Sequence, residues 1–185
     1  MRTLCIGCLH HGCGMIPAEG VIRQVIGLYA LAVLVMAVDA ATKVVALETL
    51  FYPPRVIDVL PFFRLVPVWN SGISFGMLQD AGVYAQLILG GFAVIVGLAL
   101  PYYTKAWGRA GRLGGQMMAG GAFGNALDRL IYGRVVDFID LYAGQWHWPA
   151  FNVADTAITI GAGLILLSTL GNKTGKDRPE GDSNR

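Results

Sequence analysis

Four long apolar stretches alternate with more polar connections along this chain. The first covers residues 22–46, and the stretch over 81–104, which contains no charged residue, is the clearest of the four. Two further stretches cover 113–132 and 152–171, and the third is rich in glycine. About 20 apolar residues are enough for a helix to cross the hydrocarbon core of a bilayer. The pattern therefore predicts an all-α membrane protein with four transmembrane helices.

The connection after the first apolar stretch has a different character. Four prolines between residues 53 and 67 exclude one long helix there. The segments 55–60 and 62–69 are short, rich in β-branched and aromatic residues, and bounded by proline. We therefore expect a small extramembrane β-cradle over about 49–70, lying near the lipid surface.

The connection before the last apolar stretch is rich in aromatic residues. Tyr142, Trp146 and Trp148 all lie between residues 140 and 150. Aromatic side chains of this kind gather where a membrane meets water. We predict an interfacial segment over about 140–150, on the same side of the membrane as the β-cradle.

Composition and charge support a membrane location and suggest an orientation. Hydrophobic residues make up 55% of the 185 residues and charged residues only 14%, whereas globular domains carry about 25% charge. The net charge of +2 is too small to indicate nucleic-acid binding. Lys and Arg occupy the residues around both ends and the loop 105–112, which predicts that these parts face the cytoplasm. The β-cradle and the 140–150 segment then face the opposite side.

The two ends of the chain lie outside the predicted membrane domain of residues 21–171. Residues 1–20 form an N-terminal cytoplasmic extension in this interpretation, and residues 172–185 form a polar, disordered cytoplasmic tail. The first apolar run is longer than a cleavable signal sequence requires, so we interpret it as a retained span. A cluster of Cys and His near the N-terminus fits either a zinc site or free thiols on the reducing side; it comprises Cys5, Cys8, His10, His11 and Cys13.

Ionisable residues are few, and several gather at one membrane edge. Asp39 and Lys43 are four residues apart and can pair on one helix face. Asp137 and Asp155 each lie at the edge of a predicted span, where ionisable groups are costly. Two close carboxyl groups can act as general acid and general base on a peptide bond. Spacing alone leaves two interpretations open, a catalytic dyad or two interfacial helix caps.

Other chemistries find less support in the residues. No HExxH zinc motif and no GxSxG nucleophile motif is present. A proton-coupled membrane carrier that uses the clustered acids stays as the alternative to a peptidase. His147 lies between the two candidate aspartates, so a catalytic role for it has to be weighed against a place in the aromatic cluster.

Four motifs in chain order resemble the lipoprotein signal peptidase family, also called signal peptidase II. They are Asp39-Ala-Ala-Thr-Lys43, Asn70-Ser-Gly-Ile-Ser-Phe-Gly76, the block from Gly120 to Phe138, and Phe151-Asn-Val-Ala-Asp155. The resemblance covers about residues 22–171, and it implies a small β-cradle over about 49–70 and a periplasmic interfacial helix over about 140–150. It implies that Asp137 and Asp155 are the catalytic dyad. It also implies that a set of motif residues binds substrate or supports the site, namely Asp39, Lys43, Asn70, Gly121, Asn125, Asp128, Arg129, Asn152 and Ala154.

The same resemblance implies an activity and a location. The protein would be an intramembrane aspartic endopeptidase of the bacterial inner membrane, with its active site near the periplasmic face. Its substrates would be prolipoproteins that carry a diacylglyceryl group, cut just before the lipidated Cys. The resemblance implies no cofactor and no metal. We expect a monomer among membrane lipids, because four spans suffice to build the site, and no nucleic-acid partner.

Overall fold

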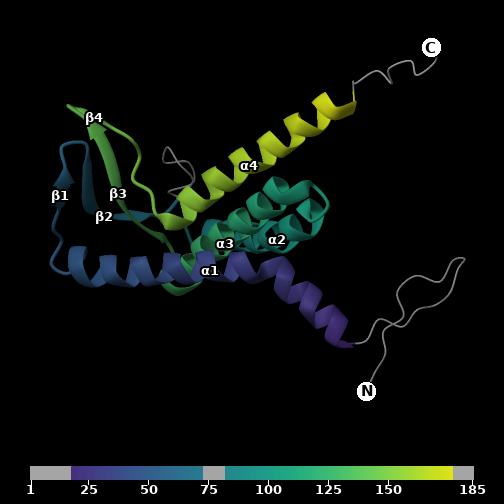
Figure 1. The fold of residues 1–185 in the computed structure, drawn as a ribbon. Helices are drawn as coiled ribbons and strands as arrows, with labels where there is room; N and C mark the ends of the chain where they lie inside the picture. Colours follow the sequence, from purple (N-terminus) through teal and green to yellow (C-terminus); the bar gives the residue numbers. More distant parts are fainter. Residues whose placement is uncertain (1–17, 73–81, 177–185) are drawn as a thin grey trace, which may run out of the picture.

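Four helices and four strands make up the parts of the chain that the structure describes, residues 18–72 and 82–176 of a computed structural model (Figure 1). The helices are α1 (Ala18–Leu50), α2 (Gly82–Thr104), α3 (Gly108–Tyr132) and α4 (Val153–Lys176). The strands are β1 (Ile57–Leu60), β2 (Phe63–Asn70), β3 (Val135–Ala143) and β4 (Trp146–His147). Three predicted features lie outside the described residues: the Cys and His cluster, the second half of the Asn70–Gly76 motif, and the chain beyond Lys176.

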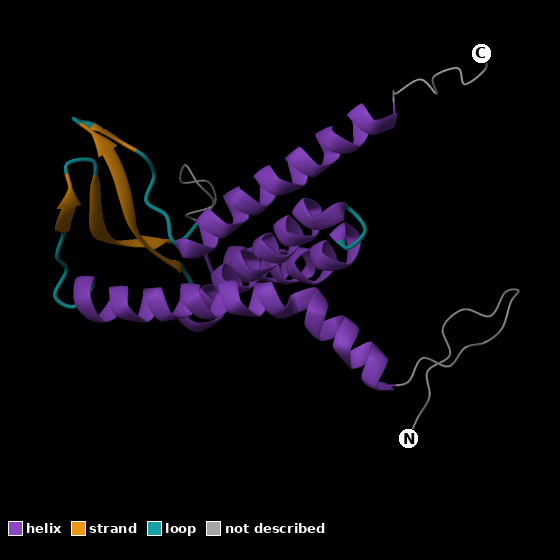
Figure 2. Ribbon diagram, in the orientation of Figure 1, coloured by secondary structure: helices purple, strands orange, loops and turns teal. Residues whose placement is uncertain are grey.

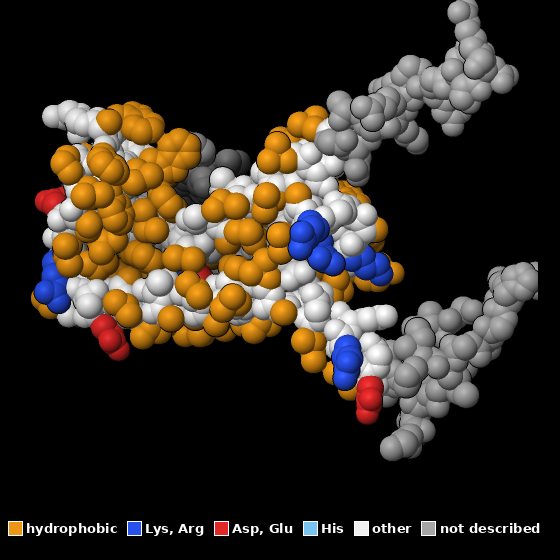
Figure 3. All heavy atoms as spheres, in the orientation of Figure 1, with side chains coloured by type: hydrophobic (Ala, Val, Ile, Leu, Met, Phe, Trp, Pro, Cys, Tyr) orange, Lys and Arg blue, Asp and Glu red, His pale blue; other side chains and the backbone are white. Residues whose placement is uncertain are grey.

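Three of the four described helices are long and apolar enough to cross a membrane, namely α1, α2 and α4. Along α1, large apolar side chains such as Val33, Leu34, Val44 and Val45 are exposed. Figure 3 shows hydrophobic side chains over most of the visible face, with Lys, Arg, Asp and Glu mostly at the two ends. An apolar belt between charged ends is the surface that a bilayer requires.

Helix α3 does not reach the hydropathy of a membrane span, although the sequence analysis predicted one over 113–132. It packs against α1, α2 and α4, and many of its small residues are buried. A side chain at Gly121 would collide with the backbone oxygen of Ala154 and with Ile158 on α4. One at Gly120 would collide with Ala32 and Val35 on α1. The glycines that lower the hydropathy of α3 therefore let three helices approach one another closely.

Several helices extend past the predicted spans. Helix α1 begins at Ala18 and ends at Leu50, beyond both ends of the 22–46 stretch. Helix α3 begins at Gly108, and α4 continues to Lys176. A helix can continue beyond its apolar stretch because its backbone hydrogen bonds lie within the helix. Hydropathy thus located these helices but did not set their ends.

The four strands form one antiparallel sheet in the order β1-β2-β3-β4. The predicted β-cradle is confirmed in β1 and β2. The predicted interfacial helix over 140–150 is wrong, because these residues form the end of β3, a turn and β4. Gly144 has a φ of 62° in that turn, a conformation that glycine adopts readily. The edge of β2 that does not pair with β1 forms hydrogen bonds with β3. The local sequence does not predict this pairing.

The sheet lies at one end of the helical bundle (Figure 2). Its inner face packs on the last turns of α1, where Ala46, Leu50 and Phe51 meet Val136 and Phe138 in a buried cluster. The turn between α2 and α3 lies at the other end of the bundle, as Figure 1 shows. Strand β3 follows α3 directly, and α4 begins after β4. This order brings the start of β3 and the start of α4 together, where the sheet meets the helices.

Candidate active site

Helix α4 begins with a reciprocal cap that fixes the position of Asp155. The Asp155 backbone N–H donates to the side-chain oxygen of Asn152 at 3.0 Å, and the Asn152 backbone N–H donates to the Asp155 carboxylate at 3.2 Å. In this capping-box arrangement each residue satisfies a backbone donor of the other. The first turn of a helix also favours a negative charge. The start of α4 therefore holds the Asp155 carboxylate in place.

Asp137 lies on β3 and is only 1% exposed. The side-chain amide of Asn70, at the end of β2, donates to Asp137 Oδ2 at 2.9 Å. The side-chain amide of Asn152 donates to Asp137 Oδ1 at 2.7 Å. Burial, together with the nearby charge of Asp155, raises the pKa of Asp137 to about 7. Asn152 thus joins the two aspartates, of which Asp137 is the one that keeps a proton below pH 7.

A buried ion cluster lies beside the two aspartates. Lys43 Nζ is 2.8 Å from Asp39 Oδ2 on α1 and 2.8 Å from Asp128 Oδ2 on α3. All three residues are buried, at 2%, 0% and 6% exposure for Lys43, Asp39 and Asp128. The backbone N–H of Ala154 donates to Asp39 Oδ1 at 2.8 Å, and that of Val136 donates to Asp128 Oδ2 at 3.0 Å. The cluster therefore anchors the two segments that carry Asp137 and Asp155.

Asn125 connects this ion cluster to the aspartates. Its side-chain amide nitrogen donates to Asp155 Oδ1 at 2.8 Å. Its side-chain oxygen accepts from Lys43 Nζ at 3.0 Å and from the amide of Asn152 at 3.2 Å. Gly121, one turn earlier on α3, leaves room for the backbone of Ala154. Close packing of α3 on α4 is what brings Asn125 within reach of Asp155.

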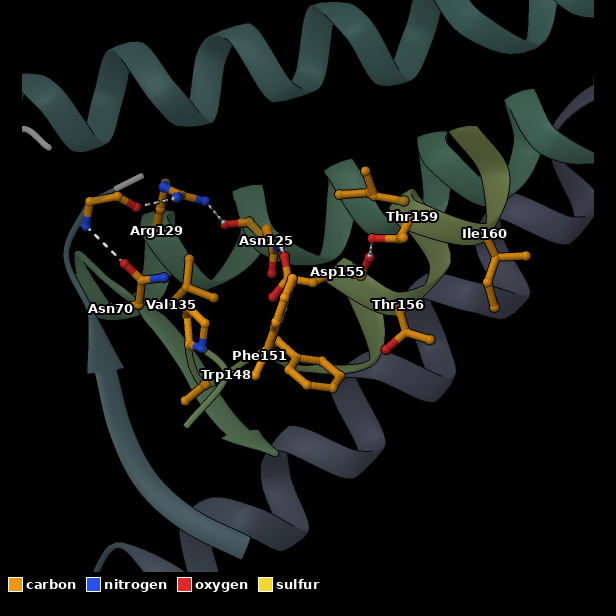
Figure 4. Close-up of a pocket in the computed structure, with 14 residues that line it drawn as sticks. Asn70, Asn125, Arg129, Val135, Trp148, Phe151, Asp155, Thr156, Thr159 and Ile160 are labelled. Carbon is orange, nitrogen blue, oxygen red and sulfur yellow. Dashed lines mark hydrogen bonds between the residues drawn. The ribbon is translucent and has the colours of Figure 1, made fainter. Parts of the chain in front are cut away.

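A cleft of about 540 Å³ opens beside Asp155. Figure 4 shows Asp155, Asn125, Arg129 and Asn70 around it, with several apolar side chains. Arg129 donates to the backbone oxygens of Asn125 and Gly72, at 3.1 and 3.4 Å. The apolar part of the lining comes from the loop before α4 and from α4 itself, including Trp148, Phe151, Ile158 and Ile160. An extended peptide with apolar side chains fits a cleft of this kind.

The structure brings together all the residues that the sequence analysis selected. Asp137, Asp155 and the other nine come from α1, β2, α3, β3 and the start of α4. The sequence analysis gave no role to Gln86, which is buried on α2 and donates to the backbone oxygen of Ser71, next to Asn70. A lone polar residue within an otherwise apolar span was the only signal for it.

Asp140 and His147 form a cluster of their own. Asp140 Oδ2 is 2.6 Å from Arg64 Nε and 3.0 Å from His147 Nδ1. Asp140 is 5% exposed. The cross-strand pairing of Arg64 with Asp140 explains its burial. His147 is bound to Asp140, and the hydrogen bonds of Asp137 and Asp155 come from the asparagines described above.

Within residues 18–72 and 82–176, no group of three or more His, Cys, Asp or Glu is placed to hold a metal ion. Asp155 lines the cleft, and Asn152 links it to the buried Asp137, whose pKa is raised to about 7. A pair of this kind can activate water on one side of a carbonyl group and protonate its oxygen on the other. The fold and the site together define an aspartic peptidase built into a helical membrane protein.

Comparison with known proteins places the chain in a family. The profile of the family described as signal peptidase (SPase) II matches residues 31–171. A lipoprotein signal peptidase of Burkholderia thailandensis is 39% identical over 142 residues, covering 76% of this chain and 85% of that protein. One of Cupriavidus taiwanensis is 41% identical over 143 residues, covering 76% and 81%. The chain belongs to the signal peptidase II family, as its four motifs predicted.

A solved structure agrees with this assignment. It is described as a bacterial membrane enzyme, and it matches with a TM-score of 0.69 and 27% sequence identity. The match covers 84% of this chain and 94% of that chain. The alternative of a proton-coupled carrier is therefore set aside, and the chain is a membrane enzyme of the aspartic peptidase class.

Proposed function

We propose that this protein removes signal peptides from prolipoproteins, with Asp155 as general base and Asp137 as general acid. The observation that carries the proposal is the shared contact with Asn152. Its side-chain amide donates to Asp137, and its side-chain oxygen and backbone N–H bind Asp155. The two carboxyl groups thereby differ in environment, one buried on a strand and one at a helix N-terminus. Such a difference separates the acid from the base.

The reaction follows from the two protonation states. Asp155 takes a proton from water while the water oxygen attacks the scissile carbonyl carbon, and Asp137 gives its proton to the carbonyl oxygen. A neutral tetrahedral diol results. Asp155 then passes its proton to the leaving nitrogen as the C–N bond breaks. Asp137 takes a hydroxyl proton back from the collapsing diol, which restores the starting state.

The substrate we propose is a precursor whose Cys already carries a diacylglyceryl group, cut just before that Cys. Ile158 and Ile160 of the cleft belong to α4, one of the candidate spans, so the cleft continues into the surface that meets lipid. A lipid-modified precursor is held in the membrane by its acyl chains. Its search for the enzyme is then confined to two dimensions, and the scissile bond lies near the water that cleavage requires.

We propose that all four helices cross the bacterial inner membrane and that the chain acts as a monomer. Although α3 is less apolar than the others, many of its small and polar residues are buried against the other helices. Its exposed residues include Leu113, Leu127 and Leu130. The exposed basic residues Lys105, Arg109 and Arg112 lie at the end of the bundle opposite the sheet. That end would face the cytoplasm together with both termini. The sheet and the dyad would then lie at the periplasmic face, and residues 21–171 would form the peptidase domain.

The dyad is tested with the substitutions Asp137→Asn and Asp155→Asn. Each keeps the size of the side chain but removes the proton transfer, so we expect cleavage of a lipid-modified precursor by purified enzyme in detergent to fall at least about 100-fold, the lower end of what one acid or base contributes. Asp58→Asn is the matched control, because Asp58 is an exposed acid on β1, and it should cleave normally. A normal rate in either dyad variant contradicts the proposal.

A further inference from the structure

Lys43 is the residue that determines which way the Asn125 side chain points. An ammonium group carries three protons and accepts no hydrogen bond. Its three partners here are Asp39 Oδ2, Asp128 Oδ2 and the side-chain oxygen of Asn125, at 2.8, 2.8 and 3.0 Å. The Asn125 atom next to Lys43 must therefore be oxygen. The amide nitrogen is left on the other side, where it donates to Asp155 at 2.8 Å.

The orientation matters because a side-chain amide presents opposite chemistry on its two faces. If the Asn125 amide turned over, its oxygen would face the Asp155 carboxylate, and its NH₂ would face the Lys43 ammonium. Both contacts would be repulsive. Asn125 is 8% exposed, so little water is at hand to relieve them. The second donor to Asn125, the amide of Asn152 at 3.2 Å, supports the same orientation but carries no charge.

We infer that Lys43 is a positioning residue for the reaction: by holding the oxygen of Asn125, it directs the Asn125 amide protons to Asp155 and so makes Asp155 the base of the pair. The inference rests on the proposed function of the dyad and adds the cause of its asymmetry. Asp137 receives its amide hydrogen bonds from Asn70 and Asn152. Burial raises the pKa of Asp137 and the charge of Lys43 partly opposes this rise, but the hydrogen-bond relay from Lys43 through Asn125 ends at Asp155.

Lys43 has a second role in the ion cluster, which a test of the first role has to leave unchanged. Lys43 also neutralises two buried carboxylates, Asp39 and Asp128, and removing it alone would leave both charges without a partner. The double variant Lys43→Met/Asp39→Asn avoids this. The natural trio carries one net negative charge, and so does the variant, in which only Asp128 stays charged. Asn at position 39 still offers an oxygen to the backbone N–H of Ala154.

The test is the pH dependence of cleavage by the charge-matched double variant in detergent, with a lipid-modified precursor. Loss of the donor makes the Asp155 anion less favourable, so we expect the acidic limb of the kcat profile to move up by about one pH unit, a tenfold loss of the anion on that limb. KM should change less than twofold. Arg129, whose charge interacts with that of Asp155, is unchanged in the variant. Asp39→Asn alone keeps the ammonium group and removes one negative charge, so the limb should stay in place or move to lower pH, whatever the rate; an equal upward shift in this variant overturns the inference.

A second measurement follows Asp155 without activity. The infrared absorption of the protonated Asp155 carboxyl group, assigned as the band lost in Asp155→Asn, should titrate at higher pH in the double variant than in the natural protein. In an Asn125→Ala background, where the amide is absent, the same pair of substitutions should cause no further shift.

The outcomes separate this inference from the proposed function. An unmoved acidic limb and an unmoved Asp155 band in a folded double variant overturn the inference, as does an equal shift in the Asn125→Ala background. Activity in Asp137→Asn or Asp155→Asn instead overturns the dyad itself. If the double variant does not fold, Lys43→Gln/Asp39→Asn provides the test, because it keeps the same net charge while the neutral amide at position 43 no longer requires an oxygen opposite it. It should also raise the pH at which the Asp155 band titrates, and an unmoved band overturns the inference.

Discussion

At the scale of single residues, the site works because similar side chains have different surroundings. Asp137 and Asp155 have the same carboxyl group, and each accepts amide hydrogen bonds. Asp137 lies on a strand at 1% exposure, while Asp155 lines the cleft in the first turn of a helix. Burial favours the neutral form of Asp137, whereas Asp155 lies at a helix N-terminus, where negative charge is stabilised. In the proposed mechanism this difference makes Asp137 the acid and Asp155 the base.

The raised pKa of Asp137 gives a prediction for activity. Because burial and the charge of Asp155 raise this pKa to about 7, Asp137 holds its proton below that pH and loses it above. If Asp137 is the general acid, the cleavage rate should fall about tenfold for each pH unit well above 7. The measurement is kcat against pH with a lipid-modified precursor in detergent. A rate that stays level up to pH 9 would contradict the assignment.

The same shift predicts how stability depends on pH. In the unfolded chain Asp137 has its ordinary pKa of 3.8, so between pH 3.8 and 7 the folded protein binds a proton that the unfolded chain does not. This contribution to stability is complete below pH 3.8 and is lost as pH rises through 7. Asp137→Asn removes the cost of the buried anion. The thermal midpoint of Asp137→Asn minus that of the natural protein, both measured in detergent, should therefore be larger at pH 8 than at pH 5. An equal difference at the two pH values would contradict the raised pKa of Asp137.

At the scale of elements, the position of α4 on α3 decides whether the residues of the site meet. Asn125 comes from α3, and Asn152 and Asp155 come from the start of α4. Gly121 makes the close approach possible, since a side chain there would collide with Ala154 and Ile158. The glycine-rich sequence of α3 is thus a requirement of packing between helices.

Gly121→Val tests this dependence. The added side chain should push the start of α4 away from α3 and separate Asn125 from Asp155. We expect a loss of stability of about 1–3 kcal/mol, which is typical of overpacking, and a larger proportional loss of cleavage. Gly91→Val is the matched control on α2, because no atom lies within 4 Å of the added Cβ position. Normal cleavage by Gly121→Val would mean that the distance between α3 and α4 does not determine the geometry of the active site.

The sequence-based prediction of an interfacial helix over 140–150 was wrong. Tyr142, Trp146 and Trp148 indicate a membrane surface, but an aromatic pattern fits an interfacial helix and a strand equally well. The pairing of β3 with β2 decided in favour of the strand. The same pairing places Asn70 beside Asp137 and Arg64 beside Asp140. Register between distant segments has no local signature, so these contacts could not be predicted.

At the scale of the whole molecule, charge and shape imply an orientation in the membrane. The sheet lies at one end of the bundle and the basic α2–α3 turn at the other (Figures 1 and 3). An apolar belt of exposed side chains lies between them along α1, α2 and α4. This arrangement suits a protein whose catalytic end faces the periplasm and whose basic end faces the cytoplasm.

The orientation can be measured with single cysteines in a variant whose native cysteines are replaced by serine. Asp58→Cys lies on exposed β1, and Ala106→Cys lies in the exposed α2–α3 turn. A membrane-impermeant maleimide should label position 58 in intact spheroplasts and position 106 only after the membrane is opened. Labelling of position 106 in intact spheroplasts would reverse the proposed orientation.

Hydropathy and short motifs are local properties of the chain, and they were enough to predict the membrane class, the place of four helices, the β-cradle and the family. The motifs also selected Asp137, Asp155 and their supporting residues. The folded structure was needed to see that Asn152 joins the two aspartates, that Lys43 contacts the side-chain oxygen of Asn125, and that α3 packs against the other helices. These facts depend on register and on the distance between helices. Both are set by the packing of segments that lie far apart in the chain.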